Sequence, residues 1–176
     1  MVCTRKQRTK RKRERVKRDM EYHLTRCVWE ITLACCFSCR YCGSKGGKAR
    51  DSELTTEECL NVADQLAELG CRRVSMIGGE VFMRSDWKEI VSALSRKNIN
   101  VNIITNGFIF DENIIRSIKE VGVESVSVSI DGPKDIHDKY RQNGSFGRAV
   151  KAMEILCKAD ISVSVITPDF IASYIA

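Results

Sequence analysis

The feature that most constrains the fold is a regular alternation between short segments rich in β-branched residues and longer amphipathic segments. Five segments have the composition of strands: residues 27–34, 72–77, 99–105, 124–130 and 161–167. Four segments have the apolar spacing of helices: residues 55–70, 85–98, 111–122 and 145–159. Strands that alternate with such helices form βαβ units, whose right-handed crossovers build a parallel sheet. We therefore predict an α/β fold of parallel βα repeats, about five strands and four helices, forming either an open doubly wound sheet or part of a barrel.

The ends of the predicted helices carry capping residues. The predicted N-caps are Thr55, Ser85, Asp111 and Ser145. Glu58 follows Thr55 by three positions, which is the spacing of a capping box. Gly70 and Gly122 follow apolar helical stripes, and each suits the left-handed residue that commonly ends a helix.

The residues that depart from this regular pattern all lie just after a predicted strand. They are a cysteine group after the first strand, Gly78-Gly79-Glu80 after the second, Thr105-Asn106-Gly107 after the third, and Ser129 with Asp131 at the end of the fourth. The carboxyl ends of parallel strands share one rim, where α/β proteins build their active sites. Each short motif alone also suits an ordinary turn. Their common position predicts that they converge on one site.

The cysteine group is the strongest chemical signal in the sequence. Cys35, Cys36, Cys39 and Cys42 lie within eight residues. Zinc usually takes four ligands in two separated pairs, and this chain has no second pair. Cys36 is a poor ligand candidate, because adjacent side chains point apart. Three thiolates on one loop instead suit a [4Fe–4S] cluster with one iron left open to an exogenous ligand.

The other five cysteines are interpreted as ordinary residues: Cys3, Cys27, Cys59, Cys71 and Cys157. Cys59 and Cys157 are predicted to lie on buried helix faces, as small apolar side chains. The sequence has no apolar run of the roughly 20 residues that span a bilayer, and no apolar signal segment follows its basic N-terminus. We expect a cytoplasmic protein with no membrane partner, in which clustered thiols serve as metal ligands rather than disulfides.

Cys35, Cys39 and Cys42 resemble the CxxxCxxC signature of radical S-adenosylmethionine (SAM) enzymes, with aromatic Tyr41 before the last cysteine. The segments "GGE", "ITNG" and "VSIDG" follow in that family's order between residues 28 and 167. The segment 132–156 is similar to the SPASM-type subgroup, which includes peptide maturases. The resemblance implies a partial TIM-like barrel, a [4Fe–4S] cluster and S-adenosyl-L-methionine as cofactors, and an oxidoreductase that forms a 5′-deoxyadenosyl radical.

The resemblance also implies a role for individual residues. Cys35, Cys39 and Cys42 would be the metal ligands, and no catalytic residue beyond them is implied. Gly78, Gly79 and Glu80 would receive the methionine ammonium, with Tyr41 near the adenine and Thr105 and Asn106 lining the SAM site. Ser129 and Asp131 would meet the ribose, and Arg141 the carboxylate. A surface ion pair is the alternative role for Arg141. The implied partners are a peptide or protein substrate and an electron donor such as a flavodoxin or ferredoxin.

The two ends of the chain differ from the predicted repeats. Residues 1–18 hold ten Lys and Arg and one acidic residue, so we predict a basic tail over residues 1–20 and one core domain over residues 21–176. Such runs are most often solvated, and we do not expect a nucleic-acid partner. After the fifth strand we expect no covering helix and no sixth strand, so the core resembles a C-terminally truncated member of the family.

Three other functional hypotheses stay open at this point. The chain is an iron–sulfur protein without radical chemistry, a zinc-holding module that uses its basic tail on nucleic acid, or an inactive remnant of the barrel. Elemental analysis distinguishes the zinc-holding module from an iron protein. SAM cleavage distinguishes the enzyme from the iron–sulfur protein without radical chemistry and from the inactive remnant.

Overall fold

The computed structural model of the chain describes residues 24–168 and contains one five-stranded sheet. The strands are β1 (Arg26–Glu30), β2 (Arg73–Ile77), β3 (Asn100–Thr105), β4 (Ser125–Ser129) and β5 (Ser162–Ile166). They pair in the order β1-β2-β3-β4-β5, and every pair is parallel. All five predicted strands are present, and each is shorter than the sequence pattern indicated. This order, in which each strand lies beside the next along the chain, is that of a barrel segment rather than of a doubly wound sheet.

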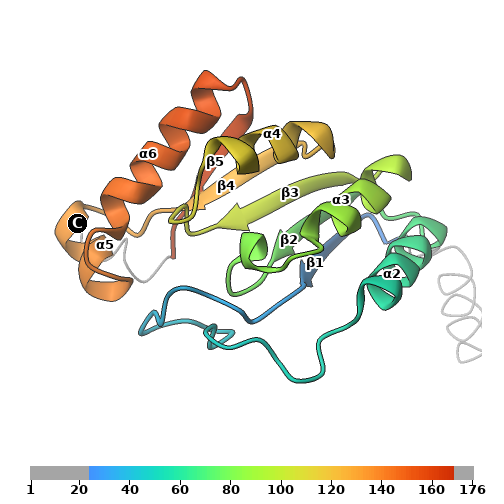
Figure 1. Cartoon of the computed structure of the whole chain (residues 1–176), viewed down its shortest axis with the longest axis horizontal. Coiled ribbons are helices and arrows are strands. Elements are labelled where there is room, and N and C mark those ends of the chain that lie inside the picture. Colours follow the sequence, from blue (N-terminus) through green and yellow to red (C-terminus); the bar gives the residue numbers. More distant parts are fainter. Residues whose placement is uncertain (1–23, 169–176) are drawn as a thin grey trace, which may run out of the picture.

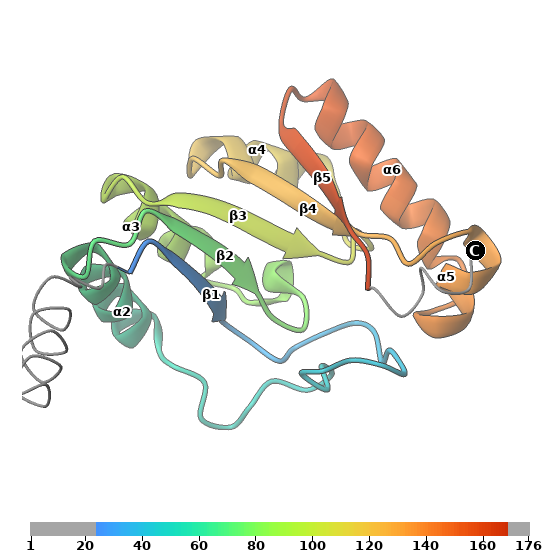
Figure 2. The same cartoon turned by 180° about the vertical axis from the view of Figure 1, so that it is seen from behind.

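The helices follow the strands and pack mainly on one side of the sheet. They are α2 (Thr56–Glu68), α3 (Trp87–Arg96), α4 (Glu112–Glu120), α5 (Lys134–Tyr140) and α6 (Ser145–Lys158), with a short 3-10 helix η1 (Val81–Met83) after β2. Figures 1 and 2 show α3, α4 and α6 on the same face of the sheet. The short helix α5 was not predicted; it lies between β4 and α6, where the pattern indicated four helices in all.

The core lies between this face of the sheet and the helices. Its fully buried side chains include Val74, Met76, Ile90, Leu94, Val101, Ile103, Ile118 and Leu156. Alternate residues of the strands point to the opposite face, which combines polar side chains with Ile77 and Ile104. There Asn102 Oδ1 accepts hydrogen bonds from Ser125 and Ser127, and Ser127 lies 2.8 Å from the Ser164 hydroxyl. These serine and asparagine side chains share the inner side of the sheet with Ile77 and Ile104.

Several helix ends confirm the sequence reading. Thr55 and Glu58 form the predicted capping box on α2, and Asp111 accepts the Ile114 N–H at the start of α4. Gly70 and Gly122 have φ angles of 79° and 76°, as a left-handed helix end requires.

Two predicted caps are wrong. Asp86, not Ser85, is the N-cap of α3, and its carboxylate binds Arg84 and Thr56 rather than the helix end. Gly144 is the N-cap of α6, so Ser145 is the first helical residue. The Asp138 side chain accepts the Phe146 N–H at 2.8 Å instead. At α6 a side chain eight residues before Phe146 therefore supplies the cap bond, whereas α3 has no side-chain cap bond.

The cysteines outside the group behave in two ways. Cys59 is buried in the core, as predicted, and Cys71, for which no burial was predicted, is buried as well. Cys157 is exposed, so its predicted burial is wrong. The buried stripe of α6 runs through Ala149, Ala152 and Leu156, and Cys157 lies one residue, about 100° around the helix, past its last member. The predicted basic tail at residues 1–20 lies outside the described residues, as do Cys3 and residues 169–176.

Candidate active site

A cavity of about 270 Å³ lies at the carboxyl ends of the strands, where the unusual residues were expected to meet. Its walls come from the loop after β1, the ends of β2, β3 and β4, and the end of α5. The lining residues are Cys35, Phe37, Cys39, Tyr41, Cys42, Gly43, Ser44, Ile77, Gly78, Gly79, Ile104, Thr105, Asn106, Ser129 and Arg141. Ten of the twelve predicted site residues are among them; Glu80 and Asp131 lie fully buried behind the wall.

The three predicted cluster ligands open onto this one cavity. The Phe37 N–H donates to Cys35 Sγ at 3.4 Å, and the Gly46 N–H donates to Cys42 Sγ at 3.3 Å. Each of these two sulfurs thus accepts a backbone N–H, and the thiolate is the form in which cysteine binds metals. Cys36 is absent from the cavity lining, although the Asn106 amide lies 3.6 Å from its sulfur. Cys36 therefore differs from the other three in that it does not line the cavity.

The thiols are not arranged for a single metal ion. Within residues 24–168, no group of three His, Cys, Asp or Glu side chains is close enough to hold one ion. A mononuclear zinc site requires such convergence. The thiolates of an iron–sulfur cluster bind different iron atoms, so three cysteines spread around one cavity suit a cluster better than zinc.

The pKa values of the cysteines follow from burial and from one close pair. Burial raises the pKa of Cys39. The hydrogen bond between the Cys35 and Cys36 thiols raises the pKa of Cys35 and lowers that of Cys36 to about 7. A metal-bound thiol is deprotonated, so a cluster held by these thiols would displace their protons.

Gly78 and Gly79 have a role that the sequence did not reveal. A Cβ atom on Gly78 would lie 2.7 Å from the Thr32 carbonyl oxygen, and one on Gly79 would lie 2.4 Å from the carbonyl oxygens of Leu33 and Ala34. The Gly79 N–H donates to Thr32 O at 2.8 Å. The sequence suggested that these glycines admit a ligand. They line the cavity, and they also let the end of β2 pack directly against the start of the cysteine loop.

Glu80 supports the wall from behind. Its carboxylate accepts hydrogen bonds from the Thr105 hydroxyl at 2.9 Å and the Asn106 N–H at 2.9 Å, and the Phe82 N–H lies 3.4 Å away. Burial raises the pKa of Glu80 to about 7, against the opposing effect of these donors. Glu80 thus fixes two of the residues that face the cavity.

Asp131 and Arg141 form a buried ion pair at the other side of the cavity. The Arg141 guanidinium donates to Asp131 at 2.5 and 2.9 Å, and the Tyr41 hydroxyl also donates to this carboxylate. The Arg141 side chain is only 11% exposed, so the pair differs from the surface ion pair considered as its alternative role. With Asp131 fully buried, Arg141 and Tyr41 form the part of this group that faces the cavity.

His137 is a site residue that the sequence reading did not select. It is fully buried on α5, and its Nδ1 accepts the Asp131 N–H at 3.2 Å. It therefore fixes the backbone of the residue that holds Arg141 and Tyr41. The apolar wall residues Phe37, Ile77 and Ile104 were also missed. Ile77 and Ile104 directly precede the predicted Gly78 and Thr105, and this adjacency was the available signal.

Comparison with known proteins decides the family. The family model of the radical SAM superfamily matches residues 29–171 of the chain. The chain belongs to the radical SAM superfamily. This family uses a [4Fe–4S] cluster and S-adenosylmethionine, which agrees with the cofactors that the cysteine motif implied.

Three of the curated relatives of this radical SAM chain show the range of the similarity. Mycofactocin maturase MftC of Mycolicibacterium smegmatis is 33% identical over 143 residues, covering 79% of this chain and 36% of that protein. The sporulation killing factor maturation protein SkfB of Bacillus subtilis is 32% identical over 140 residues, covering 79% and 34%. The AdoMet-dependent heme synthase of Methanosarcina barkeri is 33% identical over 143 residues, covering 80% and 41%. The chain therefore spans roughly a third to two fifths of the length of these relatives.

Solved structures confirm the fold of this radical SAM chain. Streptococcus suis SuiB bound to its precursor peptide SuiA has a TM-score of 0.75 at 15% identity, covering 90% of this chain and 36% of that one. Native anSMEcpe with bound AdoMet has a TM-score of 0.66 at 20% identity, covering 81% of this chain and 43% of that one. The predicted partial barrel is confirmed. Among residues 24–168, no helix is both long and apolar enough to cross a membrane.

Proposed function

We propose that this chain is the catalytic core of a radical SAM enzyme, with a [4Fe–4S] cluster on Cys35, Cys39 and Cys42 and SAM in the adjoining cavity. One observation carries the proposal: the three cysteines and the ends of β2, β3 and β4 share the walls of one cavity. A simple electron carrier needs only the thiolates. The shared cavity supports a protein that holds a second molecule beside its cluster.

The residues around the cavity fit these two cofactors. When bound, the cluster supplies the electron that cleaves the SAM sulfonium to methionine and a 5′-deoxyadenosyl radical, which abstracts hydrogen from the substrate. Gly78 and Gly79 present backbone without side chains at the wall, where the methionine ammonium is proposed to bind. Arg141 is held in place by Asp131 and offers a planar guanidinium to a carboxylate.

The remaining wall residues orient the bound molecule and exclude water. Ser129 offers a hydroxyl at the end of β4, and it is the ribose contact that the resemblance implies. Thr105 and Asn106 are fixed by Glu80, and Tyr41 by Asp131. Phe37, which packs edge-on against Phe108 with ring centroids 5.0 Å apart, provides an apolar wall near the thiols. An apolar wall that excludes water limits the side reactions of a radical.

We further propose a peptide or protein as the substrate, and a flavodoxin or ferredoxin as the electron donor. The support for a peptide is that two of the three relatives are named for maturation and that SuiB was solved with a precursor peptide. The heme synthase relative identifies a tetrapyrrole as the alternative substrate class. The electron donor is required because cleavage of SAM consumes one electron.

The proposal is tested by anaerobic reconstitution with iron and sulfide, followed by dithionite and SAM. The measurements are iron per chain, cluster absorbance and 5′-deoxyadenosine. We expect cluster absorbance and slow formation of 5′-deoxyadenosine without added substrate. Cys39→Ala should abolish both, and the matched variant Cys36→Ala should retain both.

Three outcomes would contradict the proposal. An iron-loaded protein that forms no 5′-deoxyadenosine would be an iron–sulfur protein without radical chemistry. Zinc in place of iron would exclude the cluster. Equal loss of iron in Cys36→Ala and Cys39→Ala would show that the ligand assignment is wrong.

A further inference from the structure

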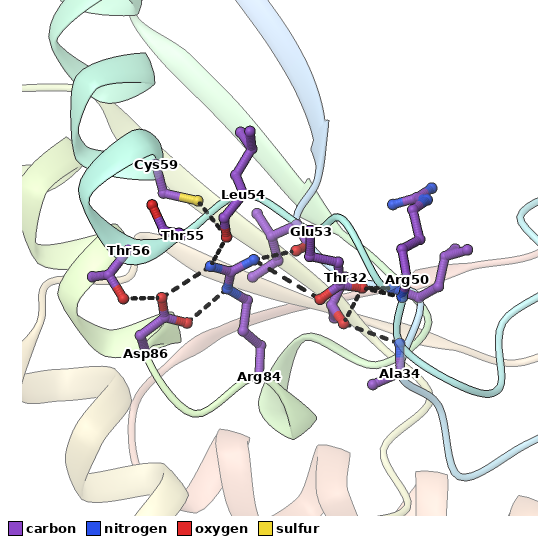
Figure 3. Close-up of polar contacts among 12 residues, drawn as sticks. Thr32, Ala34, Arg50, Glu53, Leu54, Thr55, Thr56, Cys59, Arg84 and Asp86 are labelled. Atoms are coloured by element: carbon purple, nitrogen blue, oxygen red, sulfur yellow. Dashed lines mark hydrogen bonds and ion pairs between the residues drawn. The ribbon is translucent and has the colours of Figure 1, made fainter.

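A second polar group, outside the cavity, joins the two ends of the cysteine loop. It consists of Thr32, Glu53, Thr56, Arg84 and Asp86, which we call the loop clamp (Figure 3). Within the described residues, none of the five lines the cavity. The members come from three places: the chain just after β1, the segment that enters α2, and the turn between η1 and α3.

Arg84 is the centre of the loop clamp. Its guanidinium donates to two backbone carbonyls, Ile31 O at 2.7 Å and Leu54 O at 2.7 Å. These carbonyls lie at opposite ends of the cysteine loop. The same guanidinium makes a paired contact with Asp86, at 2.6 and 2.9 Å. The Arg84 side chain is only 9% exposed. Its bonds to Ile31 O and Asp86 are partly shielded from water, whereas its bond to Leu54 O is exposed.

Glu53 makes a second connection between the two ends. Its Oε1 accepts from Thr32 Oγ1 at 3.0 Å, from the Leu33 N–H at 2.7 Å and from the Arg50 N–H at 3.2 Å. The donors Thr32 and Leu33 lead into Cys35, and Arg50 lies on the returning part of the loop. The Glu53 carboxylate lies 4.0 Å from the Arg84 guanidinium. This ion pair links the hydrogen bonds of Glu53 to those of Arg84.

Asp86 attaches this group to the helical layer. Its carboxylate accepts from the Thr56 hydroxyl at 2.6 Å, and Thr56 is the first residue of α2. Figure 3 shows Arg84 between Asp86 on one side and Glu53 on the other, with the Leu54 carbonyl above it. The loop clamp thus ties the cysteine loop to the starts of α2 and α3, which pack on the sheet.

The loop needs such an external support. Residues 31–55 contain no helix or strand, and one isolated bridge, between Ala34 and Gly47, lies within them. Loops of this length without secondary structure are uncommon in compact domains, and they are usually functional. Fixing both ends of such a loop restricts the separation of the three thiols that it carries.

From these contacts we infer that Arg84, with Glu53 and Asp86, is a positioning residue for the cluster. It sets the separation of the two ends of the cysteine loop, and through it the positions of Cys35, Cys39 and Cys42. The inference rests on the proposed function for the identity of the bound group, but the contacts themselves exist in the iron-free chain. Lysine does not replace arginine here, because one ammonium cannot direct donors at two carbonyls and a carboxylate in a plane.

The test compares Arg84→Met, Arg84→Lys and Glu53→Gln with the wild-type chain and with Arg73→Met. Arg73 is the matched control, because it pairs with Glu124 at 3.1 Å at the opposite end of β2 and is more exposed. Hydrogen exchange of the iron-free proteins is measured for the loop, where the Cys35 and Gly47 amides are hydrogen-bonded, and for β4 as an internal reference. The rate of iron loss to a ferrous chelator is measured on reconstituted protein.

We expect loop amides to exchange about tenfold faster or more in Arg84→Met, with β4 unchanged, and iron loss to accelerate by a similar factor. Arg84→Lys should resemble Arg84→Met, and Arg73→Met the wild type. Equal acceleration in the loop and in β4, or none in the loop, would overturn the inference. If Arg84→Met does not fold, hydrogen exchange and iron loss in Arg84→Lys and Glu53→Gln test the inference in its place. A wild-type chain that takes up no cluster refutes the proposed function alone, since the exchange experiment still decides the positioning role.

Discussion

Replacing Gly79 with alanine should separate the end of β2 from the cysteine loop. The added Cβ would lie 2.4 Å from the carbonyl oxygens of both Leu33 and Ala34. Real Cβ atoms essentially never approach other atoms closer than 3.0 Å, so the two backbones must move apart by about 0.6 Å. Neither obstacle is a flexible side chain, and rotation of a side chain therefore cannot relieve the contact.

The movement also affects hydrogen bonds that join the same two segments. The Gly79 N–H donates to Thr32 O at 2.8 Å, and the Glu80 N–H donates to Ala34 O at 2.7 Å. Overpacking of this kind costs about 1–3 kcal/mol, and a weakened backbone hydrogen bond adds about 1 kcal/mol. We expect Gly79→Ala to lower the free energy of unfolding by about 2–4 kcal/mol and to reduce cluster loading severely.

Gly47→Ala is the matched control for this experiment. Gly47 lies in the same loop, but no heavy atom lies within 4 Å of a Cβ built on it, and its φ is not in the left-handed region. Urea unfolding of the iron-free proteins gives the free energies, and iron per chain after reconstitution gives the loading. Gly47→Ala should stay within about 0.5 kcal/mol of wild type. Wild-type stability and loading in Gly79→Ala would refute the reasoning, as would equal damage from Gly47→Ala.

Two further substitutions test the helix end and the buried carboxylate. Thr55→Ala removes the capping box of α2 and should lower the free energy of unfolding by about 1 kcal/mol, measured by urea titration; an unchanged midpoint would contradict the box. Glu80→Gln tests the pKa of about 7 that burial gives this carboxyl group. The folded chain retains the Glu80 proton up to about pH 7, whereas the unfolded chain releases it near pH 4.3. The stability of the wild type relative to Glu80→Gln should therefore fall by roughly 3 kcal/mol as pH rises from about 4 to 7. A difference that is constant across that window, in iron-free protein, would show that Glu80 is ionised throughout.

The sequence by itself determined the elements and their chemistry. Val and Ile at alternate positions specified the strands, apolar stripes specified four of the five helices, and the rule that parallel strands share a rim brought the motif residues to one place. Spacing and residue type alone marked Cys35, Cys39 and Cys42 as candidates for a cluster. The strands, the helices and the cysteine spacing are local features, because each depends on residues within one element or in the turn next to it.

Tertiary structure decided which residues face the cavity and which support it. Asp131 and Glu80 have the chemistry of ligand-binding carboxylates, yet both are buried behind the residues that they hold. Arg84 gave no signal in the sequence, since its partners Ile31 and Leu54 lie 53 and 30 positions away. Sequence periodicity shows which face of an element is apolar. Only the packed chain decides which distant carbonyl or carboxylate a polar side chain reaches, because that depends on how several elements meet in space.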